Sequence, residues 1–240
     1  MLALTLTACA SNNGATDDFD DDYDDDFDLF GYEEPADPLE PFNRGVFFFN
    51  ETVDGMILRP IALVYDGIVP GEIQDLVRNF ARYIASPVVL ANDLLQGDWE
   101  RAENTTARIF VNSMTLGLGD LVPERHPYHS ADFGQTMAIY GVGEGFYLVL
   151  PILGPSTVRD GVGMGVDSII HPLTYVDGTT TFRIGTNAAE GIDLRARNID
   201  TLDELRRDAV DFYARMRSLY FQRRQAHIDK IDDTMAGDGF

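Results

Sequence analysis

The chain has 240 residues, enough for one folded domain of about 200 residues with additional tails. Its formal charge of -22 at pH 7 would be repelled by a phosphate backbone, so nucleic-acid binding is excluded. A single cysteine excludes an intramolecular disulfide and a thiolate metal cluster, and we expect neither a metal nor a cofactor.

The cysteine, Cys9, follows a short apolar run that starts at Met1. The run ends in Leu6-Thr7-Ala8-Cys9, which resembles the lipobox of bacterial lipoprotein signal peptides, whose cysteine is acylated and becomes the mature N-terminus. The run is short and no Lys or Arg precedes it, so we expect the true translation start upstream of Met1. Residues 1–9 are predicted to be a signal peptide that ends at a lipidated Cys9. A buried free cysteine is the alternative.

Aspartate dominates the segment that follows. Nine of the twelve residues from Asp17 to Asp28 are Asp, and the first 40 residues contain 13 acidic side chains and no basic ones. Such a segment cannot bury enough apolar surface to offset the entropy of ordering it. We therefore predict a disordered acidic linker over 10–36. An acidic docking tail or a Ca²⁺ site is the alternative, although the glycine and glutamate of an EF-hand loop are missing.

From residue 37 the sequence predicts a mainly α domain over 37–228, built of short amphipathic helices, with a flexible tail over 229–240. Helix starts are indicated by capping residues, prolines and hydrophobic spacing. They fall at Asp37, Pro60, Gly71, Ser86, Asp98, Asp132, Ser156 and Thr201. The last of these helices has a capping box at Thr201 and Glu204 and is expected to run to about His227.

Three consecutive phenylalanines, Phe47, Phe48 and Phe49, widen the apolar face of the first helix. They cannot all point into one small core, so we expect them to face lipid; a large core that holds two of them is the alternative. The apolar stretch from Phe133 to Leu153 is interrupted by glycines, a proline and charge, which argues against a transmembrane helix. Short helices with wide apolar faces would instead lie within one leaflet.

A continuous aromatic and branched run from Phe146 to Leu150, which includes Tyr147, predicts one short buried strand in a fold with very little β structure. Gly141, Gly143 and Gly145 precede it. They indicate backbone with positive φ, or a wall that an acyl chain can approach, so they and Tyr147 are our candidates for a hinge or channel wall. Gly161 and Gly165 lie one helical turn apart and favour a close helix contact, with a glycine-rich turn as the alternative.

Motifs for catalysis are missing from the sequence. There is no G-x-S-x-G or H-E-x-x-H motif and no thiol nucleophile beyond Cys9. His126 and His129 are expected in a solvated loop, and Ser156 is interpreted as a helix cap. We therefore predict a protein that is not an enzyme.

Nine segments in one colinear order resemble the MlaA (VacJ) family of outer-membrane lipoproteins, and the resemblance covers about Asp37 to Gln225. The matching segments are Asp37 to Arg44, Arg59 to Ala62, Leu94 to Asp98, Arg108 to Asn112, Asp132 to Thr136, Gly141 to Pro151, Gly154 to Asp160, Glu190 to Asp193 and Tyr220 to Arg223.

This resemblance implies a ring-like, membrane-embedded helical body in the periplasmic leaflet of the outer membrane. It implies an amphipathic channel through which phospholipids mislocalised in the outer leaflet leave, which maintains lipid asymmetry. The implied partners are phospholipids, a trimeric porin and a soluble periplasmic phospholipid carrier.

Two other functions remain as alternatives. One is a scaffolding lipoprotein that binds an envelope partner through arginines near the C-terminus, namely Arg206, Arg207, Arg215, Arg217, Arg223 and Arg224. The other is a phospholipase. The sequence does not indicate a headgroup preference.

Overall fold

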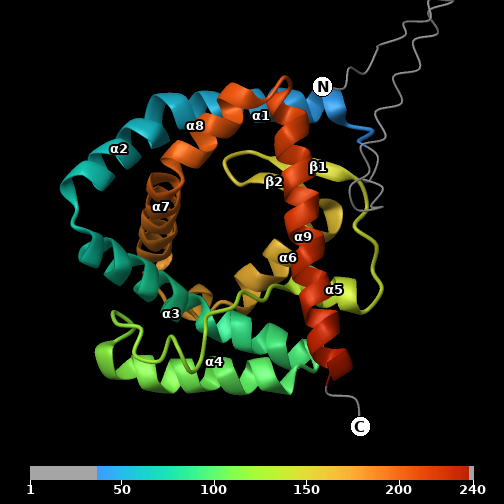
Figure 1. Ribbon diagram of the computed structural model, residues 1–240. Helices are drawn as coiled ribbons and strands as arrows, with labels where there is room; N and C mark the ends of the chain where they lie inside the picture. The colour runs from blue at the N-terminus through green and yellow to red at the C-terminus, as the bar shows by residue number, and fades with distance from the viewer. Residues whose placement is uncertain (1–36, 238–240) are drawn as a thin grey trace, which may run out of the picture. The chain divides into compact units, whose positions relative to one another are not determined.

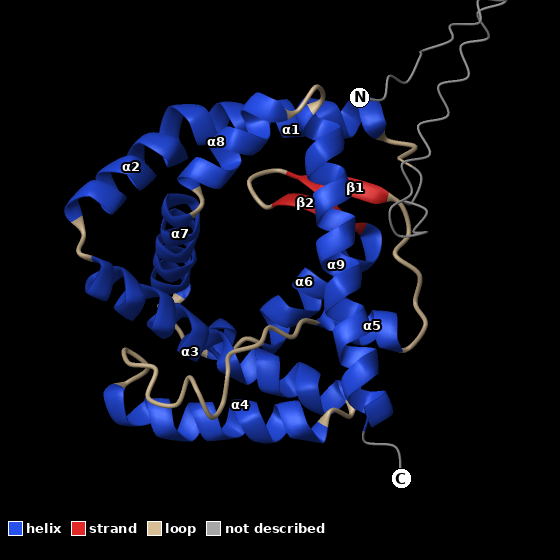
Figure 2. Ribbon diagram, in the orientation of Figure 1, coloured by secondary structure: helices blue, strands red, loops and turns tan. Residues whose placement is uncertain are grey.

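The computed structural model describes residues 37–237, so the predictions for the signal peptide 1–9, for Cys9 and for the linker 10–36 lie outside the described residues. Within 37–237 helices dominate and one small hairpin is the β structure, as Figure 2 shows, which confirms the mainly α prediction. No helix in this range combines the length and the hydropathy that crossing a membrane requires.

The elements follow in chain order. They are α1 (Glu40–Val53), the π-helical turn η1 (Asp54–Leu58), α2 (Arg59–Ile68), α3 (Gly71–Gln96), α4 (Trp99–Asn112), the 3₁₀ turn η2 (Ser113–Thr115), α5 (Phe133–Ile139), β1 (Tyr147–Leu150), β2 (Gly154–Thr157), α6 (Val158–Ile170), the 3₁₀ turn η3 (Pro172–Tyr175), α7 (Thr180–Arg197), α8 (Ile199–Asp208) and α9 (Phe212–Gly237).

The helices of residues 37–237 form a ring around a central opening (Figure 1). α1 and α2 make one arc, α3 with α4 beside it makes the next, and α5, α6 and α9 complete the circle. The contacts of α9 with α5 and β2, and those of α1 with β1, join the last helix to the first through the hairpin. α7 packs on α2 and α3, and α8 connects it to α9.

The first helix begins two residues later than the sequence predicts, and Asp37 is not its N-cap. The cap position is Leu39, which makes no side-chain cap bond. The Asp37 carboxylate instead accepts a 2.8 Å hydrogen bond from the Asn43 amide and a short one from the Tyr213 hydroxyl on α9. Asp37 therefore connects the start of the ring to its last helix.

The predicted break before Pro87 is wrong, because α3 continues through this proline as one helix of 26 residues. Proline removes one intrahelical donor, a cost that tertiary contacts can outweigh. The two residues after it, Val88 and Val89, are buried, so packing holds the helix together at this point. The helix ends at Gly97, whose φ of 76° is the left-handed conformation predicted for a C-cap glycine.

Of the three N-caps predicted between residues 98 and 156, two are confirmed and one is wrong. Asp98 accepts from the amide of Arg101, and Asp132 accepts from the amide of Gln135. Ser156 is not a cap. Thr157, the last residue of β2, performs this role by accepting from the amide of Asp160 at 3.2 Å.

The hairpin is antiparallel, with Tyr147 opposite Thr157 and Leu150 opposite Gly154. β1 confirms the predicted strand, whereas β2 was not predicted. Two asparagine side chains of α1 form hydrogen bonds with the backbone of the hairpin, as the backbone of a neighbouring strand would. The amide of Asn43 donates to the Tyr147 carbonyl at 3.0 Å and accepts from the Val149 amide at 2.9 Å, and Asn50 bonds Leu150 and Ile152 in the same manner.

The C-terminal region differs from the prediction in four respects. The expected long helix is interrupted at residues 209–211, so that α8 and α9 meet in an elbow. Asn198, and not Thr201, occupies the N-cap position of α8. α9 continues to Gly237, beyond the expected end near His227. α7 was not predicted.

Candidate lipid-binding site

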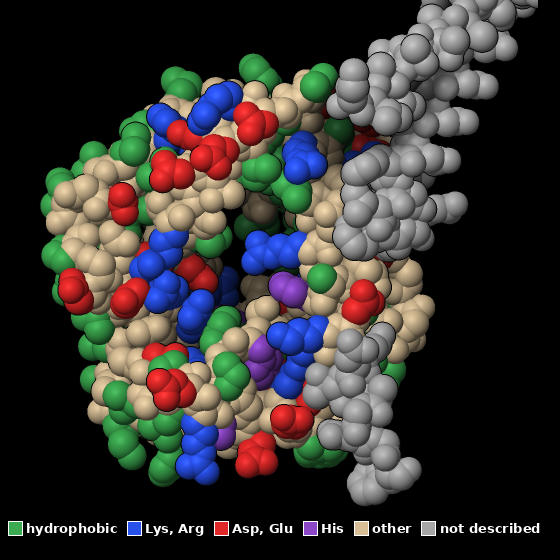
Figure 3. Space-filling model, in the orientation of Figure 1, with side chains coloured by type: hydrophobic (Ala, Val, Ile, Leu, Met, Phe, Trp, Pro, Cys, Tyr) green, Lys and Arg blue, Asp and Glu red, His purple; other side chains and the backbone are tan. Residues whose placement is uncertain are grey.

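The opening of the ring persists in the space-filling view, where basic and histidine side chains gather around it and hydrophobic side chains are spread along the outer edge (Figure 3). Large hydrophobic side chains are exposed on nearly every helix. The most exposed ones on the first four helices and the turns between them are Phe48, Met56, Ile68, Trp99, Phe110, Met114 and Leu116. Exposed apolar surface on this scale is typical of a protein whose surroundings are not only water.

The interior shows the complementary pattern. Among residues 37–231, buried polar and charged side chains outnumber buried hydrophobic ones. Buried polar groups need partners, since an unsatisfied one costs about 1–3 kcal/mol. Hydrogen bonds and ion pairs between helices supply partners for many of these groups, so the ring is not built around an apolar core alone.

The three phenylalanines of α1 point in different directions. Phe47 packs against Phe212 and Tyr213 of α9, with ring centroids 5.6 and 5.5 Å apart. Phe48 and Phe49 are exposed, Phe48 to 73%. The structure thus places Phe47 in an internal aromatic contact and leaves Phe48 and Phe49 available to lipid, whose contact with them stays a prediction.

The glycines before the hairpin fall into two groups. Gly141 and Gly145 have φ values of 78° and 72°, in agreement with the positive φ that the sequence predicts. Gly143 does not have a positive φ. A Cβ on Gly145 would also lie 3.1 Å from Val158, while Gly141 and Gly143 face open space. The three residues form the turn between α5 and β1, and their role as a hinge stays a prediction.

Tyr147, a channel candidate, is fully buried. Its ring packs on Tyr213, Tyr220 and Phe221 of α9 at centroid distances of 5.5 to 6.1 Å. This aromatic cluster attaches the hairpin to the last helix, so the structure places the Tyr147 side chain in the packing between β1 and α9.

A network of ion pairs joins α1, η1 and α2 to α7 and α8. Arg195 donates to Asp54 at 2.7 and 3.0 Å. Arg59 reaches Asp203 at 2.6 Å, and Arg206 reaches Glu51 at 2.6 Å. Arg195 is 7% exposed on its side chain, and its pairing is therefore screened less by solvent than a surface pair.

A second network attaches α9 to α5 and α6. Both terminal nitrogens of Arg224 donate to Asp132 at 2.6 Å, and one also donates to Asp160 at 2.8 Å. Tyr220 donates a short hydrogen bond to Asp160. Burial alone would raise the pKa of Asp132, but the hydrogen bonds and charge of Arg224 outweigh it and hold this pKa below its ordinary value.

The glycine contact between helices is made by Gly163, and not by Gly161 or Gly165. A Cβ on Gly163 would lie 2.5 Å from the backbone nitrogen of Gly134, so α6 and α5 touch at this point. Gly165 has nothing within 4 Å. The predicted close helix contact exists, but it is made by the glycine that lies two positions from each of the predicted ones.

His126 and His129 lie in a loop, as the sequence predicts, but both residues are half-buried and hydrogen-bonded. The ring nitrogen Nε2 of His129 lies 2.9 Å from a carboxylate oxygen of the fully buried Asp93, which also accepts from Thr105 at 2.6 Å. His126 bonds Asn104. The segment that carries both histidines folds back over α3 and α4. Within 37–231 no group of three or more His, Cys, Asp or Glu residues could hold a metal ion.

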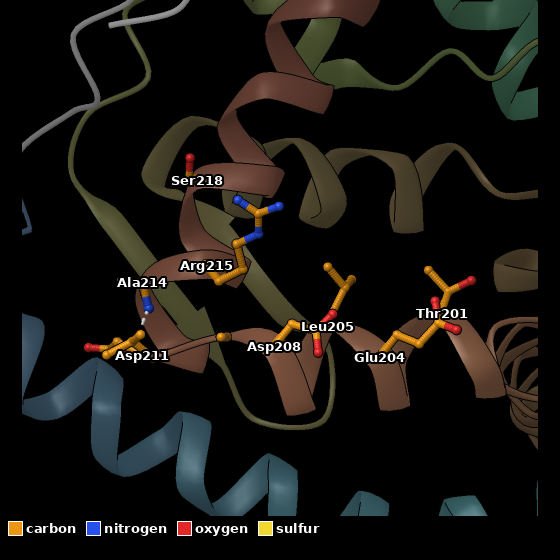
Figure 4. Close-up of a pocket in the computed structure, with 10 residues that line it drawn as sticks. Thr201, Glu204, Leu205, Asp208, Asp211, Ala214, Arg215 and Ser218 are labelled. Carbon is orange, nitrogen blue, oxygen red and sulfur yellow. Dashed lines mark hydrogen bonds between the residues drawn. The ribbon is translucent and has the colours of Figure 1, made fainter. Parts of the chain in front are cut away.

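A cavity of about 680 Å³ lies in the angle between α8 and α9, two helices that border the opening (Figures 1 and 4). Ten side chains line it. They are Thr201, Glu204, Leu205, Asp208, Ala209, Val210, Asp211, Ala214, Arg215 and Ser218. In Figure 4 the side chain of Arg215 extends from α9 into this angle. The side chains of Thr201, Glu204 and Leu205 extend from α8 toward the same side. Sequence reasoning grouped Arg215 with other arginines as a partner surface, and two of those, Arg206 and Arg224, lie in the internal networks described above.

Several residues that position the site were not singled out from the sequence. Asn43 and Asn50 lie two helical turns apart on one face of α1, a spacing that indicates a shared role. Their partners are backbone atoms of the hairpin, about a hundred residues along the chain. A single sequence contains no signal for a pairing at that separation.

A family model described as MlaA lipoprotein matches residues 35–227. The intermembrane phospholipid transport system lipoprotein MlaA of Escherichia coli (strain K12) is 35% identical over 196 residues, which cover 78% of this chain and 76% of the relative. The protein of the same name from Haemophilus influenzae is 30% identical over 236 residues, which cover 95% of this chain and 87% of the relative.

A solved structure from work on the structural basis for maintenance of bacterial outer membrane lipid asymmetry superposes with a TM-score of 0.72. It is 35% identical in sequence and the match covers 80% of this chain and 99% of that one. With a family model, curated relatives and a solved fold in agreement with the ring of helices, the chain belongs to the MlaA lipoprotein family.

Proposed function

We propose that this protein is an outer-membrane lipoprotein of intermembrane phospholipid transport, which removes phospholipids from the outer leaflet and so maintains lipid asymmetry. The observation that carries the proposal is the distribution of side chains on residues 37–231. Hydrophobic side chains are exposed along the outer edge and charged side chains surround the opening. Such a ring suits the acyl region at its edge and a lipid headgroup at its centre.

The ring lies in the periplasmic leaflet, held there by its apolar edge and by an acyl anchor on Cys9. Two signals are needed for stable anchoring, since one short acyl chain alone binds a bilayer only marginally. The opening serves as an amphipathic channel, in which Gly141, Gly143 and Gly145 act as a hinge beside the hairpin. The relatives are named as lipoproteins of an intermembrane phospholipid transport system, and these names support the transport function.

The partners of this transport step are a trimeric porin, which places the ring in the outer membrane, and a soluble periplasmic carrier, which receives the lipid. Transfer of an intact phospholipid breaks no bond, so no general base is needed. A phospholipase would differ by releasing free fatty acid, and purified protein incubated with phospholipid vesicles is expected to release none.

The proposal is tested by measuring phospholipid in the outer leaflet of cells that lack the gene, through an enzyme that palmitoylates lipids using surface-exposed phospholipid as donor. Exposed phospholipid should rise, wild type should restore it, and Cys9→Ala should not. Ser11→Ala, which leaves the lipobox unchanged, is the matched control. The absence of a rise would overturn the transport function, and full restoration by Cys9→Ala at normal protein level would overturn the anchor.

A further inference from the structure

The cavity between α8 and α9 contains charged side chains that the rest of the described chain does not use. Within 37–231, Glu204, Asp208 and Arg215 have no hydrogen-bond or ion-pair partner. Their neighbours on α8 are different, because Asp203 pairs with Arg59 and Arg206 pairs with Glu51. Asp211, which also lines the cavity, pairs with Arg44, whereas the side chains of Glu204, Asp208 and Arg215 are available to a ligand.

The two acids and the base face the cavity from different helices. Glu204 and Asp208 are four residues apart on α8, which puts their carboxylates on one face about one turn apart. Arg215 rises from α9 across the angle, with Ser218 three residues further along the same face. One wall of the cavity is therefore anionic, and the other presents a guanidinium and a hydroxyl.

We propose that this cavity binds the zwitterionic headgroup of phosphatidylethanolamine. This proposal rests on the transport function proposed above and adds a headgroup preference to it. The guanidinium of Arg215 donates to the phosphate oxygens, a geometry for which arginine is well suited. The ammonium of the ethanolamine donates to the carboxylates of Glu204 and Asp208.

The arrangement of charges favours this headgroup over the glycerol headgroup of phosphatidylglycerol. Both lipids offer a phosphate to Arg215, but only ethanolamine offers a cation to the two acids. An anionic lipid without that cation would bring its phosphate near two unneutralised carboxylates, which is unfavourable. The volume of about 680 Å³ lies in the range of small-molecule sites, and Leu205, Ala209 and Ala214 supply apolar lining.

The test uses the full-length protein in detergent micelles and measures binding of phosphatidylethanolamine and phosphatidylglycerol separately by native mass spectrometry. We expect wild type to prefer phosphatidylethanolamine. The double variant Glu204→Gln, Asp208→Asn should weaken its binding about tenfold, the loss of roughly one charge-assisted hydrogen bond, without weakening phosphatidylglycerol. Arg215→Ala should weaken both lipids.

The matched controls are Asp200→Asn and Arg207→Ala, which remove charges of α8 outside the cavity and should change neither affinity. Because the side chains of Glu204, Asp208 and Arg215 have no hydrogen-bond or ion-pair partners within 37–231, the variants should keep the wild-type melting temperature. Equal affinity of wild type for the two lipids, or equal loss of both in the acid variant, would overturn the headgroup proposal. If wild type binds no phospholipid at all, the transport proposal fails instead.

A competition arm separates the lipid from the free headgroup. Soluble phosphoethanolamine should displace phosphatidylethanolamine only at concentrations far above that of the lipid, because it lacks acyl chains to place against the apolar surface. Displacement by phosphoethanolamine at concentrations equal to those of the lipid would indicate a site for the free compound and would overturn the assignment to phospholipid.

Discussion

Asn43 is a fully buried residue whose amide completes the hydrogen bonding of a strand edge. It performs for β1 what a third strand would perform in a larger sheet. A buried side-chain amide has four hydrogen-bonding positions, and α1 and the hairpin supply partners for three of them through Asp37, Tyr147 and Val149. The orientation of the hairpin is thus fixed from the first helix.

Asn43→Ala should lower the free energy of unfolding by about 2–4 kcal/mol, because the Tyr147 carbonyl and the Val149 amide would be left buried without these partners. Chemical denaturation in detergent measures the loss. Asn198→Ala is the control, because its amide donates to the Leu194 carbonyl, four residues earlier in the chain, in an exposed hydrogen bond. Similar losses in both variants would contradict the role given to Asn43.

Gly163 is the second residue whose identity the packing determines. Gly163→Ala should lower the free energy of unfolding by about 1–3 kcal/mol, since the new methyl group would lie 2.5 Å from the backbone of Gly134 and push α6 from α5. Gly165→Ala on the same helix meets no atom within 4 Å and should raise it slightly. The melting temperatures of the two variants, measured beside wild type, test these opposite expectations. A Gly163→Ala variant more stable than wild type would refute the contact.

At the scale of elements, α9 is held to α5 and α6 by the pairing of Arg224 with Asp132 and Asp160. The pKa of Asp132 is lower in the folded protein than its ordinary value. Its contribution to stability is therefore complete above the ordinary carboxyl pKa and is lost as the pH falls through the folded pKa. The attachment of the last helix should weaken in acid.

The melting temperature of wild type should accordingly fall between about pH 5 and pH 3, and Asp132→Asn should reduce that dependence while lowering stability at pH 7. A melting series across this range checks both statements. Asp200→Asn removes an exposed carboxylate with no such pairing and serves as the control. An unchanged pH dependence in Asp132→Asn would contradict the assignment.

The sequence predicts those elements whose signals are local. Asp98, Asp132 and Gly97 mark helix ends because each acts through backbone within a few residues. Pro87 misleads, since the packing of α3 decides that the helix continues. α7 and the elbow at residues 209–211 depend on contacts with distant helices, and the same holds for the site. The cavity between α8 and α9 exists only because the helix bends there, a feature that its capping box does not indicate.

On the scale of the whole molecule, the apolar outer edge is the feature that relates residues 37–231 to a membrane. Residues with opposite environments are adjacent on α1, because Phe47 packs internally while Phe48 is 73% exposed. The single tryptophan, Trp99, is also exposed on α4. Phe47 and Phe48, which are adjacent in α1, therefore allow a direct comparison between a position in the interior and one on the outer edge.

In a Trp99→Phe background, tryptophan placed at Phe48 should be quenched strongly by phospholipids with brominated acyl chains. Tryptophan placed at Phe47 should be quenched much less, because that position faces Phe212 and Tyr213. Fluorescence in vesicles of brominated and ordinary lipid gives the comparison. Equal and weak quenching at both positions would show that the edge does not reach the acyl region.

The ring of residues 37–237 is closed by bonds between its first and last elements, since Asp37 and Arg44 reach Tyr213 and Asp211. These pairs are separated by 176 and 167 positions along the chain. Contacts at such separation form late and slow the folding of a chain. During synthesis the ring cannot close until α9 has been made. The polypeptide can therefore stay unfolded, and so able to cross a membrane, until its last helix is present.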